Sequence, residues 1–318
     1  MNGVETRPQR EYSPEVAKVS LERTERISKK KRKNKIRKIK DAIILCLCTL
    51  IIIVCLCLIT YFINGGGVNV KTYGVFPKKQ IEQTEIENMY TSFSYYKEEN
   101  QRRYEDYASA NPTLNPETVV WMVNANQDKQ KYNYDIEVTG YDDIKIIVNK
   151  YYKIPDDYAP ADLVLVDGQK LREEAATAFK KMRSDASGKG LKIRAVSGYR
   201  TVEYQRGLYN RYLSSDSQEN VDRYSARPGY SEHHTGLAVD IFGSRDGLRQ
   251  FVNTPEFPWV RDNCYKYGFI IRYLEETEEI TGYESEPWHL RYVGVDVSTD
   301  MKNKGINSFE EYHAKYLQ

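Results

Sequence analysis

The 318-residue sequence predicts an α+β domain preceded by one transmembrane helix. Two observations lead to this fold class. After residue 141, predicted strands and helices are mixed without the regular spacing of βαβ units, which favours α+β over a doubly wound parallel sheet. Residues 42–63 form an apolar run of 22 residues without a charge, which matches the roughly 20 residues needed to cross a bilayer.

The apolar run is predicted to be a retained membrane span. A cleaved signal peptide is the alternative, but its apolar core is usually about 7–15 residues and lies at the very N-terminus. Here the run begins after 41 residues, although the glycines at 65–67 keep the alternative open. Residues 29–40 carry nine Lys or Arg, so the positive-inside rule predicts a cytoplasmic basic arm over residues 1–41 that contacts anionic lipid.

The remainder of the chain is predicted to lie outside the cell, as a single-pass protein of the cell membrane. Beyond residue 41 there are 33 Lys or Arg against 39 Asp or Glu, and this mildly acidic balance gives no sign of nucleic-acid binding. Four of the five cysteines lie within the span, so Cys264 has no partner for an internal disulfide.

The exterior part divides into a linker with a helical stalk over 64–114 and a folded domain over 115–318. Helical spacing of apolar residues predicts one helix over 80–108, and the run TVVWMVN at 118–124 predicts a short strand. The domain is then expected to contain strands at 144–148, 163–166, 191–196, 236–242, 269–273 and 289–293, with helices at 169–184, 201–212 and 247–267, the last interrupted near Pro255 and Pro258.

The histidines indicate a metal site. The chain has four, and three of them fall in two short strings, SEHHTGLAVD at 231–240 and EPWH at 286–289. Imidazole and carboxylate are the ligands of a catalytic zinc ion, which keeps one position open for water.

Asp240 interrupts an apolar strand, where an unpaired carboxylate would be costly. It is either a metal ligand or one half of a buried salt bridge, for example with Arg245. If its strand neighbours the strand of His289, then His233, Asp240 and His289 converge as three ligands. His234 remains the alternative to His233 on spacing alone.

Glu286 and Arg200 are the candidate catalytic residues. Glu286 lies beside a Pro-Trp-His string and is a candidate base, whereas the alternative is a solvated acidic loop with its neighbouring glutamates. Arg200 follows a predicted strand in the turn SGYR, where a guanidinium can bind a carboxylate or a developing oxyanion. A surface arginine is the alternative.

Three ordered motifs resemble the VanY-type D-alanyl-D-alanine carboxypeptidases, zinc peptidases of the lysostaphin/D-Ala-D-Ala-peptidase/Sonic-hedgehog superfamily. S-x-H-x-x-G-x-A-x-D is matched at 231–240, E-x-W-H at 286–289 and S-G-Y-R at 197–200, and the similarity extends from about residue 115 to 295. The resemblance implies an antiparallel-sheet zinc peptidase domain with flanking helices. It further implies Zn²⁺ held by His233, Asp240 and His289, catalysis by Glu286 and Arg200, and substrate contacts from Ser231 and Gln205.

The sequence and the resemblance together predict a membrane-anchored zinc carboxypeptidase that removes the terminal D-alanine from peptidoglycan stem peptides. An LD-carboxypeptidase acting on tetrapeptide stems is one alternative. A non-catalytic zinc module that binds the cell wall is another, and the intact Glu286 and Arg200 argue against it. A non-haem iron oxygenase also uses two histidines and a carboxylate, but it needs a cytosolic co-substrate.

Overall fold

The computed structural model describes residues 89–133 and 136–318. The predicted basic arm at 1–41 and the predicted span at 42–63 therefore lie outside the described residues. Within the two described ranges, no helix combines the length and the apolar character that a membrane crossing requires.

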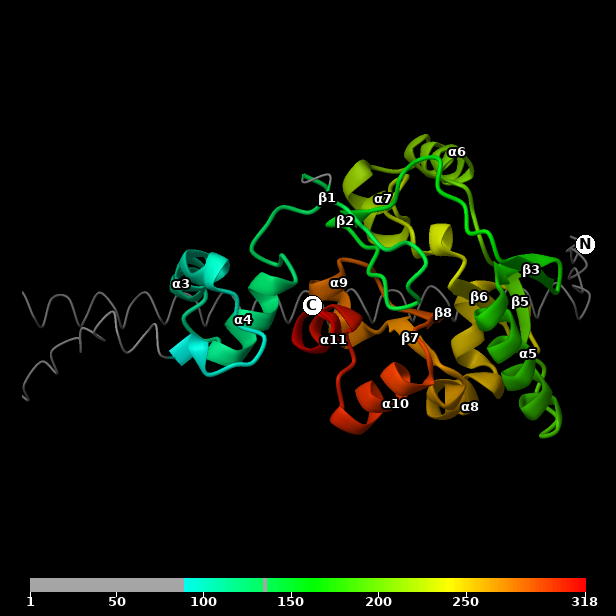
Figure 1. Ribbon diagram of the computed structural model, residues 1–318. Helices are drawn as coiled ribbons and strands as arrows, with labels where there is room; N and C mark the ends of the chain where they lie inside the picture. The colour runs from blue at the N-terminus through cyan, green and yellow to red at the C-terminus, as the bar shows by residue number, and fades with distance from the viewer. Residues whose placement is uncertain (1–88, 134–135) are drawn as a thin grey trace, which may run out of the picture. The chain divides into compact units, whose positions relative to one another are not determined.

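A four-stranded antiparallel sheet forms the centre of the domain (Figure 1). The strands lie in the order β5-β6-β8-β7, and they comprise β5 (Arg194–Ser197), β6 (Ala238–Phe242), β8 (Glu286–Tyr292) and β7 (Phe269–Tyr273). Four of the seven predicted strands fall on these positions, and the antiparallel pairing confirms the predicted α+β class.

The two faces of the sheet differ in chemistry because side chains alternate along each strand. Val239, Ile241 and Leu290 point into the main apolar core and are fully buried. Asp240 and His289, which come from the same two strands, project from the opposite face. The apolar face is covered by α5 (Glu173–Ser187), α8 (Glu256–Asn263) and the 3-10 turn η4 (Cys264–Tyr267), whose residues join the same core.

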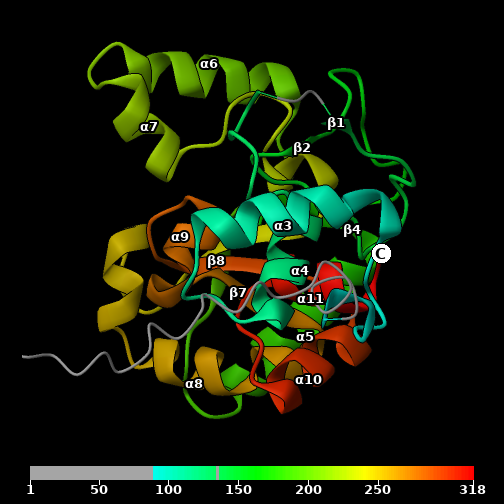
Figure 2. The same cartoon turned by 90° about the vertical axis from the view of Figure 1, so that its left-hand side faces the viewer.

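The polar face is covered by segments from several parts of the chain. Both views show the helices α6 (Val202–Leu213) and α7 (Gln218–Tyr224) across the sheet from α8 and α10 (Val295–Lys304) (Figures 1 and 2). The C-terminal helix α11 (Phe309–Tyr316) packs through Phe309 and Tyr312 on Ile270 of β7. Shorter helical elements between these segments are α9 (Glu278–Thr281), η2 (Glu232–Thr235), η3 (Leu248–Asn253) and η5 (Glu275–Thr277).

Two small sheets complete the domain. The hairpin of β3 (Leu163–Val166) and β4 (Gln169–Arg172) confirms the strand predicted at 163–166. The helix expected from Gln169 begins only at Glu173, because residues 169–172 pair with β3 across a turn at Asp167 and Gly168, both with positive φ. The second small sheet pairs β1 (Ile136–Glu137) with β2 (Tyr152–Lys153).

The strand predicted at 118–124 is wrong, because this segment is the helix α4 (Pro116–Asn124). Asn115 caps the helix, since its side chain accepts a hydrogen bond from the Thr118 N–H at 2.8 Å, and Pro116 occupies the first turn. Its valines pack against Tyr104 of α3 (Gln101–Ala110). The Asn-Pro pair therefore starts a helix here.

Two further expectations differ from the structure. Residues 144–148 form no strand, and the carbonyls of Ile144 and Ile146 accept hydrogen bonds from the Arg291 guanidinium instead of from a neighbouring strand. The single helix expected over 80–108 is interrupted in its described part, since residues 92–97 are not helical and a 3-10 turn, η1 (Glu98–Asn100), leads into α3. By contrast, the break expected near Pro255 is present between η3 and α8, whereas Pro258 lies within the first turn of α8 and does not interrupt it.

Candidate metal and catalytic site

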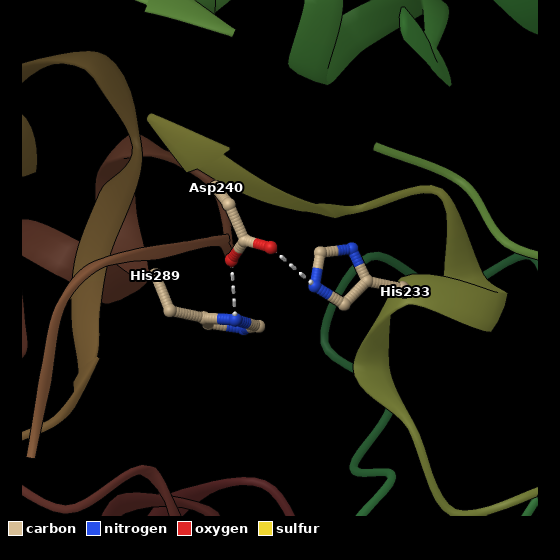
Figure 3. Close-up of side chains that lie close together, drawn as sticks. All are labelled: His233, Asp240 and His289. Atoms are coloured by element: carbon tan, nitrogen blue, oxygen red, sulfur yellow. Dashed lines mark hydrogen bonds and ion pairs between the residues drawn. The ribbon is translucent and has the colours of Figure 1, made fainter. Parts of the chain in front are cut away.

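Three of the predicted ligands meet on the polar face of the sheet. Asp240 on β6 lies directly opposite His289 on β8 in the antiparallel ladder, and their side chains approach to 3.1 Å between Oδ1 and Nδ1. His233 belongs to η2, and its Nε2 lies 3.3 Å from Asp240 Oδ2 (Figure 3). One ligand atom from each residue lies within 4.8 Å of the other two, and all three residues are buried.

A left-handed glycine brings His233 to this point. Gly236 ends η2 with φ +67°, and the chain turns there directly into β6. A Cβ at this position would lie 2.9 Å from Leu163 Cδ2 of β3, so a side chain would require Leu163 to shift in addition to straining the backbone. The glycine of the S-x-H-x-x-G motif therefore places His233 beside Asp240.

The orientation of both imidazoles fits a bound metal ion. His233 Nδ1 lies 2.8 Å from the Gly198 carbonyl, which leaves its Nε2 directed at Asp240. His289 shows the reverse arrangement, with Nε2 at 3.4 Å from the buried Glu232 carboxylate and Nδ1 toward Asp240. In metal sites the outer nitrogen of a ligand histidine is usually held by a carbonyl or carboxylate in this way.

The electrostatics of the cluster favour a cation. Burial alone would lower the pKa of His289, but hydrogen bonds that the imidazole donates to the Asp240 and Glu232 carboxylates outweigh burial and raise it to about 9. Burial and the nearby Arg200 lower the pKa of His233 to about 4, so this ring is neutral and offers a lone pair. Burial opposes ionisation of Asp240, yet the two histidines hold the pKa of its carboxyl well below the usual range.

His234 does not join the cluster. Its Nδ1 lies 2.8 Å from the Arg200 carbonyl, and its Nε2 accepts a hydrogen bond from the Gly229 N–H at 3.2 Å. Burial lowers the pKa of the His234 imidazole to about 4, which keeps it neutral in this tautomer. The structure thus assigns His234 a bracing contact to the Arg200 backbone and leaves His233 at the metal position.

Glu286 stands at the start of β8, with its Oε2 3.8 Å from His289 Nδ1. Its side chain keeps 14% of its surface exposed, toward the cavity that also contains the ligands. Burial and repulsion from Asp240 raise the pKa of Glu286 to about 8, against the attraction of His289. Its neighbour Glu284 instead pairs with Arg249 at 2.7 Å, so the acidic-loop interpretation does not describe Glu286.

Arg200 reaches the cluster from the turn after β5. Its Nη2 donates to Asp240 Oδ2 at 3.0 Å and to Ser197 Oγ at 2.7 Å. Asp240 therefore pairs with Arg200, and no contact with Arg245 is found among the described residues. Arg200 Nη1 lies 3.4 Å from Gln205 Oε1, and the Gln205 amide donates to the Ala226 carbonyl at 2.8 Å. This arginine is not a solvated surface residue.

Ser231 lines the same cavity and also has a local structural task. Its Oγ accepts the backbone N–H of His233 at 3.3 Å as the cap of η2. The cavity has a volume of about 220 Å³ and is walled by α6, α7 and the strands β7 and β8. Trp288 of the E-x-W-H motif also lines this wall. The positions of Tyr273 and Tyr283 in the wall and of Glu232 behind His289 were not predicted from the sequence, because they depend on contacts between distant segments.

The donor set suits a zinc ion. Two imidazoles and one carboxylate leave a fourth coordination position open, as in hydrolytic zinc enzymes. The same three donors also suit the iron of an oxygenase. A guanidinium and a partly exposed carboxylate beside the ligands favour hydrolysis, since these groups stabilise an oxyanion and transfer a proton. Fold and site together define a zinc metallopeptidase.

The chain belongs to the VanY family of D-alanyl-D-alanine carboxypeptidases. The family model matches residues 168–295. The putative carboxypeptidase YodJ of Bacillus subtilis (strain 168) is 40% identical over 187 residues, which cover 55% of this chain and 68% of that protein. A D-alanyl-D-alanine carboxypeptidase of Enterococcus faecium is 35% identical over 182 residues, covering 52% of this chain and 56% of the relative.

A solved structure also matches the domain. The LdcB LD-carboxypeptidase superimposes with a TM-score of 0.54 at 38% sequence identity, covering 58% of this chain and 92% of that one. This chain therefore shares its fold with nearly the whole of the LdcB chain.

Replacement of His289 by Ala is expected to remove most of the bound zinc. The wild-type chain should carry about one zinc ion, held by three protein ligands, and loss of one imidazole leaves only two. Elemental analysis of the purified full-length protein measures this. His313→Ala is the matched control, because its imidazole contacts Phe309 and Gln318 rather than the cluster. Full zinc retention in His289→Ala would remove His289 from the ligand set.

Proposed function

We propose that this chain is a membrane-anchored zinc carboxypeptidase that removes the terminal D-alanine from peptidoglycan stem peptides. The observation that supports this most strongly is the convergence of His233, Asp240 and His289 with Glu286 and Arg200 around one cavity. Membership of the VanY family supports the reaction. The cavity supports a small terminal residue, since its volume of about 220 Å³ is below the roughly 300–1,000 Å³ of ordinary ligand pockets.

Glu286 acts as the general base and acid. A bound zinc ion supplies a water molecule whose pKa is lowered to about 7 and a Lewis acid for the scissile carbonyl. Glu286 takes the proton of the attacking water and later returns it to the departing amine of D-alanine. Burial raises the pKa of Glu286 to about 8, which makes its carboxylate a stronger proton acceptor than a solvated glutamate.

Arg200 stabilises the negative charge that develops on the carbonyl oxygen. Ser197 and Asp240 hold its guanidinium at the edge of the metal cluster, so the donors are oriented before substrate binds. His234 supports the Arg200 backbone from the other side. Gln205 and Ser231 line the cavity beside Arg200 and contribute to binding of the peptide end.

A second candidate is an LD-carboxypeptidase that trims tetrapeptide stems, and the similarity to LdcB favours it. Both candidates release D-alanine, and they differ in the chirality of the residue before the cleaved bond. We first expect a D-residue at that position, because the matching family and the Enterococcus faecium relative are described as D-alanyl-D-alanine carboxypeptidases.

The function is tested with defined muropeptides and the purified full-length protein. We expect release of one D-alanine from a pentapeptide ending in D-alanyl-D-alanine, measured by mass spectrometry, and loss of this release with a zinc chelator. Cleavage of the tetrapeptide alone would establish the LD alternative. If neither peptide loses D-alanine, the chain is a non-catalytic module.

Glu286→Gln is the control variant in that experiment. The amide keeps the size of the side chain but takes no proton at neutral pH, so zinc content should stay at the wild-type level. The rate should fall by about 10²–10⁴-fold, the usual contribution of a positioned general acid–base group. A rate near wild type would show that another group transfers the proton.

Arg200→Lys is expected to lower kcat more than it raises KM. Lysine keeps the positive charge, but it lacks the planar fork that reaches Ser197, Asp240 and substrate together. Because the lost contact forms mainly in the transition state, kcat should carry the loss, as steady-state kinetics on the pentapeptide would measure. A change confined to KM would assign Arg200 to substrate anchoring.

Membrane anchoring is proposed from hydropathy and charge. The span at 42–63 and the nine basic residues at 29–40 support a catalytic domain outside the cell. Protease added to wall-stripped intact cells should digest the domain and spare the N-terminal arm, as antibodies to each part would show. Protection of the domain would contradict both the topology and a substrate in the assembled wall.

A further inference from the structure

A buried ion network lies directly behind His289. Glu232, Arg272, Arg291 and Glu310 come from η2, β7, β8 and α11, and their side chains are 0–1% exposed. Groups of this kind are rarely buried unless each is paired. These four residues take no part in the catalytic steps assigned to Glu286 and Arg200.

Glu232 connects the network to the metal cluster through its two oxygens. Its Oε1 accepts hydrogen bonds from Arg272 Nε at 2.8 Å and Arg291 Nη1 at 2.9 Å. Its Oε2 faces His289 Nε2 at 3.4 Å. Because the carboxylate accepts a hydrogen bond from Nε2–H, a neutral His289 keeps its lone pair on Nδ1, on the side of Asp240.

Glu310 balances the charge of this arrangement. Arg272 donates to the Glu310 carboxylate through both terminal nitrogens, at 2.9 and 2.6 Å. With Glu310 present, two guanidinium groups face two carboxylates. Without Glu310, the buried cluster would carry one excess positive charge beside Glu232. The Glu232 carboxylate would then interact more strongly with the two arginines and less strongly with His289.

We propose that the C-terminal helix α11 is a positioning element of the zinc site, acting through the chain Glu310, Arg272, Glu232 and His289. Glu310 lies beyond the family match at 168–295, so this extends the site to a segment outside it. The proposal concerns the affinity and geometry of the metal site, and it holds whichever stem peptide is the substrate.

The first test measures zinc affinity of the full-length Glu310→Gln protein by competition with a chromophoric chelator. We expect affinity to fall by about 10-fold, at the lower end of the 10–100-fold typical of outer-shell partners of metal ligands. Glu311→Gln is the matched control, because it makes the same charge change on the next residue of α11. Glu311 pairs with Lys315 near the surface, and Lys315 keeps Glu117, so zinc affinity should be unchanged.

The second test measures the geometry of the metal ligands and distinguishes a change in this geometry from a loss of folding. With cobalt(II) in place of zinc, the visible absorption bands should shift in Glu310→Gln and stay unchanged in Glu311→Gln. Arg272→Lys keeps the charge balance, but an ammonium lacks the fork that bridges Glu232 and Glu310. It should therefore also weaken zinc binding, unlike Arg261→Lys on the surface.

Wild-type zinc affinity and an unchanged cobalt spectrum in Arg272→Lys would overturn the proposal, even if Glu310→Gln fails to fold. The same holds if Glu310→Gln only lowers the melting temperature while its zinc affinity equals that of Glu311→Gln. In either case the network would stabilise the fold without positioning His289.

Discussion

The antiparallel register of β6 and β8 is the constraint on which the rest of the site depends. In this register Asp240 faces His289 across the ladder, and a shift by one residue would place Asp240 opposite Leu290, which points into the apolar core. The register is held from the other face, where Val239 and Leu290 pair within that core. Hydrophobic packing on one side of the sheet thus sets the distance between metal ligands on the other.

The charged groups on the polar face of the sheet are buried, so each of them needs an oppositely charged or hydrogen-bonding partner. Burial of an unpaired carboxylate or guanidinium is costly, and each one here has several partners. Arg200 meets Asp240, while Arg272 and Arg291 meet Glu232. The carbonyls of residues 144 and 146 complete the hydrogen bonding of Arg291, which explains why this apolar segment lies against the sheet without joining it.

The elements that local pattern predicted well are those in which apolar residues recur at a regular spacing along the chain. The alternation at 236–242 matches β6, and the helix expected at 201–212 matches α6 closely, with Thr201 as its cap. Local pattern failed where a distant contact decides the conformation. The valines of α4 have high strand propensity, but a capped start and packing against Tyr104 make the segment helical.

By itself the sequence determined the candidate chemistry, because scarce histidines and motif spacing single out a few residues and hydropathy singles out one span. Spacing left the choice between His233 and His234 open, and it also left the partner of Asp240 undecided. Only the tertiary structure decided these points, through Gly236, the Arg200 turn and the buried carboxylate of Glu232. The physical reason is that the direction of an imidazole lone pair and the burial of a charge depend on strands and helices far apart in the chain.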